Sequence, residues 1–470
     1  MKKNGKKYRK IKKEQELKRA LLSKNKISIC QEVDDINISM LAIAHIVEEN
    51  PILQEKEAVK EEYLSRLTRL VKSGKWNTRK FESSELSAYR KIILDSEKEE
   101  NTHEIEYYRY FILFDLFHIL GYEIKNSDIE KIEFVKKEYC VLFHNMQSDK
   151  KIVDDIFAAF VTQSTRRLKE LMKKDSLKEE KRYITLIREN MSFKKKSPSA
   201  IMVTATMSAG KSTFINALVG KYICLSQNMA CTSKIHSIIN KAFEDGYAYE
   251  YDHNLVLTAG KEELLNDNEL NTSDKIVVST KIMGELSNKR IIINDSPGVN
   301  YSENQEHKII TEKLIKRKNY NLLIYIMNAT QLGTNDEEAH LEYVKKTIGR
   351  TPVLFVVNKI DTFNTEEENV IETIKRQTEY LKKKGFKNPM VCPVSAKAAY
   401  LSKQFAKADL SRFEKRELYS LVDKFQEMNL QKYYSETFKN IKIPDSQSEE
   451  EQLLKTSGMA YVEKIIKNLL

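Results

Sequence analysis

The sequence is poor in cysteine and has no long apolar run, and each shortage excludes a class of protein. Its 470 residues include only five cysteines, scattered without a C-x-x-C pair: Cys30, Cys140, Cys224, Cys231 and Cys392. This pattern indicates neither a zinc site nor a disulfide framework, and it makes the reducing cytoplasm the expected location. The most apolar stretch, residues 110–114, is interrupted by Asp115 and His118. A bilayer-spanning helix is therefore excluded, whereas peripheral binding to the inner face of a membrane is not.

Proline and glycine are nearly absent between about residues 15 and 195, and no β-type alternation stands out there. Apolar residues recur at three- and four-residue spacing over residues 129–142, which predicts an amphipathic helix. The same spacing over residues 152–171, continued by a charged stretch to about residue 189, predicts another long helix. Residues 15–195 are therefore expected to form an all-α region.

The same region holds a group of aromatic residues and two histidines. Aromatic side chains cluster over residues 107–117, which favours a packed core over a ligand site. His103 and His118 lack metal-ligand spacing to each other. Both are expected to be ordinary helix residues.

The charge is distributed unevenly along the chain. The net charge is +11, and Lys and Arg make up eight of the first thirteen residues. No apolar run follows, so residues 1–14 are interpreted as a basic, disordered tail rather than a secretory signal. Residues 2–13 would attract anionic lipid by about 1 kcal/mol per basic residue, or would bind the phosphates of a nucleic acid. A solvated tail without a partner explains the pattern equally well.

Residues 191–198 end in Lys-Lys-Lys-Ser-Pro and read as the clearest linker in the chain. From about residue 199 onward, strand patterns alternate with helix patterns, which is typical of a parallel sheet with crossover helices. The expected organisation is therefore a tail over 1–14, a helical region over 15–195 and an α/β domain over 196–470. This domain would have helices on both faces of a mostly parallel sheet.

The first strand of this domain leads into a loop that contains glycine and lysine. An apolar run over residues 201–204 precedes Ala-Thr-Met-Ser-Ala-Gly-Lys-Ser-Thr, and a helical pattern follows. Strand, loop and helix in this order are typical of a phosphate-binding loop, in which backbone N–H groups point at phosphate oxygens. Lys211 would reach the β- and γ-phosphates, and the Ser212 hydroxyl would bind Mg²⁺. Ala205 replaces the usual first glycine of G-x-x-x-x-G-K-[ST], so the turn must accommodate a Cβ there.

Three more loops follow buried-strand patterns in an order that completes a nucleotide site. Residues 291–294 lead to Asp295-Ser296-Pro297-Gly298. A carboxylate at the carboxyl end of a strand can hold Mg²⁺ through water, and the Gly298 N–H can meet a γ-phosphate. The loop after residues 201–204 is expected to supply Met207, Ser208, Ala209, Gly210, Lys211, Ser212 and Thr213 to the nucleotide.

The remaining two loops predict which base is bound. Residues 353–357 lead to Asn358-Lys359-Ile360-Asp361, where Asp361 can accept both N–H groups of a guanine edge that adenine lacks. Lys359 would lie along the base, and Asn358 would tie this loop to the phosphate loop. After residues 391–394, the loop Ser395, Ala396 and Lys397 would offer the Ala396 N–H to the guanine keto oxygen. The four loops together predict GTP or GDP as the ligand.

With these motifs the chain resembles the dynamin superfamily, in particular bacterial dynamin-like GTPases. The resemblance rests on residues 208–220, 230–233, 295–300 and 358–361 and covers about 199–470. It implies that Thr232 is the switch threonine, whose hydroxyl joins Mg²⁺ and whose backbone helps to hold the attacking water. It also implies assembly into a homodimer or larger oligomer through the nucleotide-binding domain.

Two departures from the family bear on catalysis and on architecture. Eukaryotic members carry a water-orienting glutamine where this chain has Met207, so hydrolysis would depend on backbone groups, Thr232, Ser208 and the charge of Lys211. Members normally continue into a helical stalk and a membrane-binding tip, whereas this sequence ends at Leu470. The N-terminal helices would supply a short bundle, a partner chain would supply the stalk, or the chain is incomplete.

The expected function is hydrolysis of GTP with Mg²⁺, coupled to self-assembly and to contact with a membrane. Two other functions fit the same motifs. One is a regulatory GTP-binding switch that acts on RNA or on a ribosomal or other protein partner, with the basic tail as its anchor. The other is a nucleotide-dependent scaffold with negligible turnover, which Ala205 and Met207 permit.

Overall fold

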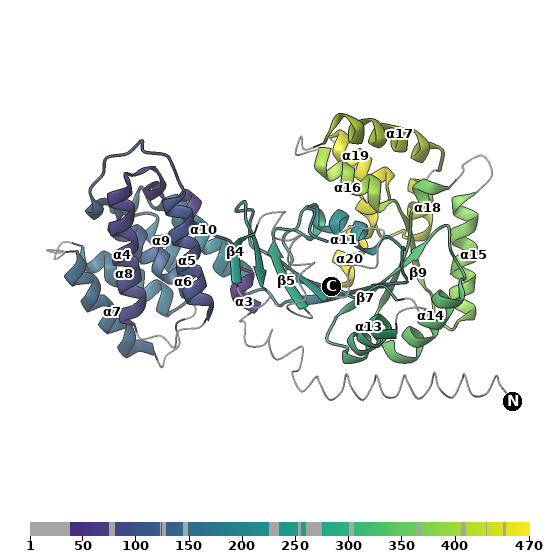
Figure 1. Ribbon diagram of the computed structural model, residues 1–470, viewed down its shortest axis with the longest axis horizontal. Helices are drawn as coiled ribbons and strands as arrows, with labels where there is room; N and C mark the ends of the chain where they lie inside the picture. The colour runs from purple at the N-terminus through teal and green to yellow at the C-terminus, as the bar shows by residue number, and fades with distance from the viewer. Residues whose placement is uncertain are drawn as a thin grey trace.

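A computed structural model describes residues 38–74, 80–122, 124, 128–143, 149–224, 235–251, 255–259, 275–299, 305–363, 369–405, 410–428, 430–444 and 448–470. Figure 1 shows a group of helices beside a large twisted sheet that carries helices of its own. The predicted tail, residues 1–14, and Thr232, which is predicted to be catalytic, lie outside the described residues. No helix in these ranges is long and apolar enough to cross a membrane.

The helical part is built from short and medium helices around one core. Its α-helices are α3 (Ile38–Leu41), α4 (Glu57–Ser73), α5 (Lys80–Leu94), α6 (Arg109–Ile119), α7 (Ile129–Leu142), α8 (Lys150–Val161), α9 (Thr165–Leu171) and α10 (Lys181–Lys194). The short turn η1 (Val47–Glu49) follows α3. The helix predicted over 129–142 is confirmed, and the aromatic cluster over 107–117 is mostly buried in the core, as expected.

The prediction of one long helix over 152–189 is wrong, because the chain turns twice within it. Gln163 has a left-handed backbone with φ of 48°, which ends α8. Ser164 then caps α9 by accepting a hydrogen bond from the Arg167 N–H at 3.2 Å. The predicted linker is also shorter than expected, because α10 continues to Lys194.

Helix α6 lies at the centre of the helical part and is buried on every side. Asp115 is buried on it and accepts hydrogen bonds from the hydroxyls of Tyr63, Tyr89 and Tyr183. The Asn50 amide donates to the same carboxylate at 3.0 Å. Burial raises the pKa of Asp115 to about 7, although these hydrogen bonds oppose the rise. One carboxyl group thus joins four segments of the helical core.

We expect Asp115→Ala to destabilise the protein by about 3 kcal/mol or more, since each buried hydroxyl that loses its partner costs about 1–3 kcal/mol. The measurement is chemical denaturation followed by circular dichroism. The matched control is Asp154→Ala on α8, because Asp154 is exposed and, among the described residues, pairs only with Lys136 at 3.2 Å. Its effect should stay within about 0.5 kcal/mol. Equal denaturation midpoints for the two variants would contradict the role of Asp115.

The sheet has nine strands among the described residues, in the order β4-β3-β5-β2-β6-β1-β7-β8-β9. They are β1 (Ser199–Ala205), β2 (Ile235–Asn240), β3 (Ala248–Tyr251), β4 (Leu255–Ala259), β5 (Lys275–Thr280), β6 (Ile291–Asp295), β7 (Leu322–Asn328), β8 (Val353–Asn358) and β9 (Met390–Val394). Strands β6, β1, β7, β8 and β9 run parallel, whereas β2 is antiparallel to β6 and β3 is antiparallel to β5 and β4. The four predicted strands and the mostly parallel sheet are confirmed.

Helices cover both faces of the parallel strands. They are α11 (Lys211–Val219), α13 (Gln305–Arg317), α14 (Asn335–Ile348), α15 (Val370–Lys383), α16 (Ala396–Phe405), α17 (Arg412–Met428), α18 (Leu430–Thr437), α19 (Glu449–Thr456) and α20 (Met459–Leu469). In the view of Figure 1, α16, α17 and α19 lie above the sheet and α13 and α14 lie below it. Because both faces are covered, β7 is buried along its whole length and β1 and β8 along most of theirs.

The helical part packs against the strands that extend the sheet beyond its parallel half. A small apolar cluster joins α3, α5 and α10 to β2, β3 and β5: Leu41, Ala42, Ala88, Phe193, Ile239, Tyr249 and Val277. The Ala242 N–H donates to the Ala42 carbonyl at 3.2 Å, and the Ser279 hydroxyl donates to the Leu41 carbonyl. The antiparallel end of the sheet is therefore the joint between the two parts.

Candidate functional site

The four predicted loops all leave the carboxyl ends of parallel strands. These strands are β1, β6, β8 and β9, and their register places Val203 opposite Asp295 and Asn358 opposite Val394. Because carboxyl ends of parallel strands meet at one edge of a sheet, ligands of such folds bind there. The fold thus brings the loops together as the sequence predicts.

The phosphate loop makes its turn after Ala205 rather than at it. Ala205 is the last residue of β1 and is fully buried, and its carbonyl accepts a hydrogen bond from the Val299 N–H at 3.0 Å. The left-handed residues of the turn are Ser208, with φ of 59°, and Gly210, with φ of 80°. A Cβ at Ala205 is therefore tolerated, because an extended strand residue does not need the freedom of glycine.

Gly210 is held against the loop that follows β8. A Cβ added to it would lie 2.4 Å from Asn358 Nδ2 and 3.6 Å from Lys359 Cε. The Asn358 amide donates to the Ala209 carbonyl at 3.0 Å, which is the tie between the two loops that the sequence suggests. Lys359 adopts a left-handed backbone with φ of 66°. Only glycine fits where the phosphate loop and this loop approach so closely.

The ion pair at the start of α11 joins two of the predicted phosphate and metal residues. Lys211 begins the helix, and its Nζ contacts the carboxylate of Asp295 at the end of β6. Both side chains are buried, at 7% and 1% exposure. Ser212 and Thr213 follow in the first turn and are partly exposed. Lys211 is thus paired with the carboxylate that is predicted to reach Mg²⁺.

Met207 and Gly298 lie against each other across the phosphate loop. The Met207 N–H donates to the Val299 carbonyl at 3.1 Å, and a Cβ built on Gly298 would lie 3.5 Å from Met207 Cγ. Ser208 is exposed beside them, and its carbonyl lies 3.5 Å from Asn328 Nδ2. A thioether neither donates a strong hydrogen bond nor accepts one well, so Met207 offers apolar bulk at this position.

The base-reading loops hold each other in place. The Ser395 hydroxyl donates to Asp361 Oδ1 at 2.7 Å, which leaves the rest of this half-buried carboxylate for a ligand. The Ala396 N–H donates to Asn358 Oδ1 at 3.0 Å. This N–H was expected to meet a guanine oxygen, so such a ligand would have to share it with Asn358. Lys397 points elsewhere: it is exposed and contacts Glu417.

Several residues that the sequence motifs did not reveal support these loops. The Lys424 Nζ on α17 donates to the Asp361 carbonyl at 2.7 Å, and the Ser395 N–H donates to the Ser457 carbonyl at 3.0 Å. Gly458 has φ of 83°, and a Cβ there would lie 2.4 Å from the Pro393 carbonyl oxygen. The only local signal was the Ser-Gly pair between two helical patterns. The last helices of the chain therefore buttress the base site.

Thr232 belongs to residues 225–234, which lie outside the described ranges. The segment just before them is fixed by the buried Asn216 of α11. Asn216 Oδ1 accepts hydrogen bonds from the N–H groups of Ile223 at 2.9 Å and Cys224 at 2.8 Å, and its amide donates to the Cys224 carbonyl at 2.8 Å. The two residues just before the predicted switch segment are thus anchored to the helix of the phosphate loop.

The site combines a phosphate loop at the end of a strand, an acidic residue on β6 and two loops that are predicted to read the base. This combination defines a P-loop GTPase domain. Residues 201–360 match the model of the Dynamin family, so this segment is a dynamin-like GTPase domain. A search of curated proteins returned no match.

Solved structures with similar arrangements include three whose chains share 16% identity with this one. Era of Aquifex aeolicus, bound to GDP·AlF4−, matches over 42% of this chain and 51% of its own, with a TM-score of 0.26. An oligomerised bacterial dynamin pair, described as a mechanism for long-range sensing and tethering of membranes, matches over 81% and 60%, with a TM-score of 0.36. The FeoB G-domain of Methanococcus jannaschii matches over 45% and 96%, with a TM-score of 0.24. The chain thus spans about half of Era and three fifths of the dynamin chain.

We expect Gly210→Ala to weaken GTP binding about a hundredfold or more, because the added Cβ would displace Asn358 from the phosphate loop. Fluorescent-nucleotide titration would measure the affinity. The matched control is Gly246→Ala, since Gly246 has φ of 81° and nothing within 4 Å of an added Cβ. Both variants carry the cost of a left-handed alanine, about 1–2 kcal/mol, but only the first crowds the site. Equal losses of affinity in both would show that backbone strain alone is responsible.

Proposed function

We propose that the protein binds GTP with Mg²⁺ and hydrolyses it to GDP and phosphate. The observation that carries this proposal is the network in which Asn358 contacts both the phosphate loop and the Ala396 loop. These hydrogen bonds fix the distance between the groups that would hold the phosphates and those that would hold the base. Recognition of a whole nucleotide requires that the groups binding its phosphates and its base be held at a fixed separation.

Guanine is the base that the network supports. Asp361 has one carboxylate oxygen occupied by the Ser395 hydroxyl, and Lys424 holds its backbone. A carboxylate that is held in this way can accept the two adjacent N–H groups of guanine, which adenine does not present. Because an unmatched buried hydrogen-bonding group is costly, such a pair of contacts discriminates strongly between bases.

The phosphates and Mg²⁺ would replace the present partners of Lys211 and Asp295. The Ser212 hydroxyl and the Asp295 carboxylate are hard oxygen donors, which Mg²⁺ prefers, and Thr232 would add a third. Bound Mg²⁺ would neutralise charge on the phosphates. Lys211 would turn from Asp295 towards the β- and γ-phosphates, so nucleotide binding exchanges one buried ion pair for another.

Hydrolysis would depend on backbone groups and hydroxyls rather than on a side chain at residue 207. Met207 packs beside Gly298, whose N–H would meet the γ-phosphate. The attacking water would then be held by Thr232, with Ser208 as an exposed hydroxyl of the phosphate loop. This arrangement predicts slow turnover by an isolated chain, which a second chain would accelerate by completing the loops.

We expect Asp361→Asn to weaken GTP binding about a thousandfold or more and to admit xanthosine triphosphate, because the asparagine amide donates where the carboxylate accepted. Competition binding with GTP, ATP and xanthosine triphosphate measures this change. Ser395→Ala should weaken GTP binding less and leave the choice of base intact. Asp154→Asn, on the helical part, is the neutral control. Equal affinity of the wild type for GTP and ATP would refute the assignment of the base.

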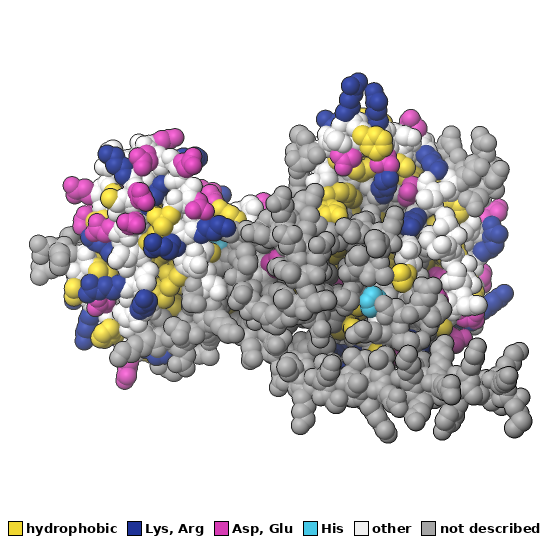
Figure 2. Space-filling model, in the orientation of Figure 1, with side chains coloured by type: hydrophobic (Ala, Val, Ile, Leu, Met, Phe, Trp, Pro, Cys, Tyr) yellow, Lys and Arg dark blue, Asp and Glu magenta, His cyan; other side chains and the backbone are white. Residues whose placement is uncertain are grey.

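Self-assembly and membrane contact are the output that we propose for this GTPase. Figure 2 shows acidic and basic side chains interspersed over the helical part, so the described residues on this face form no single-sign surface. The basic residues 2–13 lie outside the described ranges and would supply the attraction to anionic lipid. A separate stalk-bearing chain and nucleic acid are the other partners that the sequence allows.

Specific GTPase activity should rise with protein concentration, and binding to phosphatidylserine vesicles should fall as salt is added. Deletion of residues 1–13 should weaken vesicle binding and leave basal hydrolysis unchanged. Turnover is measured by phosphate release over a hundredfold range of protein concentration, and binding is measured by sedimentation. Flat activity with no vesicle binding at low salt, together with salt-sensitive RNA binding, would instead identify a solitary switch on RNA.

A further inference from the structure

Two histidines and a glutamate meet in the helical part, next to its joint with the sheet. His45 follows α3, Glu85 lies on α5 and His118 lies on α6. Their side chains are 1%, 3% and 2% exposed. Glu85 Oε1 lies 3.1 Å from His45 Nδ1 and 3.3 Å from His118 Nε2, and the potential ligand atoms all lie within 4.8 Å of one another.

We propose that His45, Glu85 and His118 bind a divalent transition-metal ion, with Zn²⁺ as the ion that suits them best. Two imidazole nitrogens and a carboxylate are a common set of zinc ligands in proteins. With metal–ligand distances of about 2.0–2.2 Å, neighbouring ligand atoms of a tetrahedral site lie about 3.3–3.5 Å apart. The two separations from Glu85 already approach this value. If both carboxylate oxygens bind, the three side chains supply four donor atoms in a distorted tetrahedral arrangement, because the two oxygens of one carboxylate lie closer together than this.

The polar contacts within the cluster leave the buried imidazole of His45 poorly satisfied. Among the described residues neither ring nitrogen makes a hydrogen bond of good geometry, and the polar contact of Nδ1 is the ion pair with Glu85 Oε1 at 3.1 Å. Both histidines are directed at the same carboxylate oxygen. An imidazole buried without hydrogen bonds is costly, and a metal bond to Nδ1 would satisfy this nitrogen.

Polar side chains around the cluster fix the orientation of the His118 ring. His118 Nδ1 lies 2.7 Å from the Tyr122 hydroxyl, which also accepts from the Asn190 amide at 3.3 Å. A partner on the far nitrogen of a histidine fixes the ring and directs the other nitrogen to the ion. The neighbouring cavity, lined by Met40, Ile43, Glu85, His118 and Tyr249, is too narrow for a water molecule. Catalytic zinc sites with two histidines and a glutamate keep a bound water, so the lack of room for one here favours a structural role for the ion.

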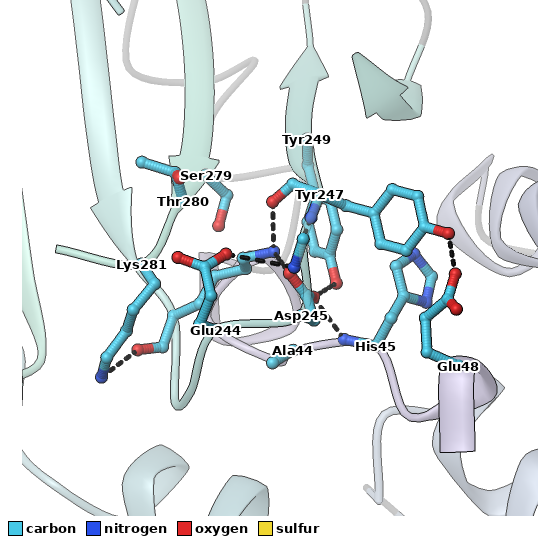
Figure 3. Close-up of polar contacts among 12 residues, drawn as sticks. Ala44, His45, Glu48, Glu244, Asp245, Tyr247, Tyr249, Ser279, Thr280 and Lys281 are labelled. Carbon is cyan, nitrogen blue, oxygen red and sulfur yellow. Dashed lines mark hydrogen bonds and ion pairs between the residues drawn. The ribbon is translucent and has the colours of Figure 1, made fainter. Parts of the chain in front are cut away.

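Figure 3 shows how His45 faces the sheet part of the protein. Its backbone N–H donates to Asp245 Oδ2 at 2.6 Å, and the Tyr249 hydroxyl donates to the same oxygen at 3.1 Å. The rings of His45 and Tyr249 pack edge to face with centroids 5.0 Å apart. An ion held by His45 would therefore fasten α5 and α6 to the segment that contacts β3. The site is structural and acts at the joint.

The experiment measures metal in the purified full-length protein without nucleotide, before and after dialysis against a chelator. We expect stoichiometric uptake of added Zn²⁺, a rise in the melting temperature, and a tetrahedral ligand-field spectrum when Co²⁺ replaces Zn²⁺. Glu85→Gln and His118→Gln should each abolish stoichiometric uptake. His340→Gln is the matched control, because His340 is a buried histidine whose Nε2 lies 2.9 Å from Thr204 Oγ1, in the sheet part.

Asp295→Asn should leave uptake unchanged, which separates this site from the proposed Mg²⁺ site and from the GTPase proposal. Retention of stoichiometric Zn²⁺ by Glu85→Gln would overturn the assignment. If the substituted proteins fail to fold, the wild type decides: a folded, chelated protein that gives no tetrahedral Co²⁺ spectrum would refute the site.

Discussion

The side-chain amide of Asn358 is the contact on which the geometry of the proposed nucleotide site depends. Its nitrogen holds the phosphate loop through the Ala209 carbonyl, and its oxygen holds the backbone of Ala396. One residue at the end of β8 thereby sets the spacing between the phosphate and base ends of the pocket. It also explains Gly210, since any side chain there would occupy the space of the amide. The same contact therefore packs the two loops together and sets the geometry of the proposed nucleotide site.

The sequence predicted the sheet part well because its signals are local. A short β-branched run followed by a polar loop identifies a strand end, and the parallel topology brings such ends together without further information. The contacts that support these loops could not be predicted in the same way. Lys424 on α17 and Ser457, directly after α19, contact these loops from far along the chain, and the Ser-Gly pair at 457–458 indicates a turn but no partner. The position of Asp361 just after β8 was therefore predictable, whereas the groups that hold it were not.

For the helical part, the sequence predicted only the all-α class and not the arrangement of the helices. Periodicity identified helices but missed the left-handed turn at Gln163, because glutamine seldom adopts that conformation and gives no warning of it. His118 was considered beside His103, its neighbour in the sequence, and was expected to be unremarkable. Its actual neighbours are Glu85 and His45, which only the folded chain brings near. Tertiary clusters of this kind have no spacing that a linear pattern could reveal.

The continuous sheet also gives the molecule a mechanical property. Asp295 ends β6, and hydrogen-bonded neighbours run from β6 through β2, β5 and β3 to the helical part. Paired strands resist shear, so they twist as one plate rather than bending strand by strand. If Lys211 releases Asp295 when phosphate binds, as proposed, any movement of β6 would reach the helical part through three successive pairs of adjacent strands.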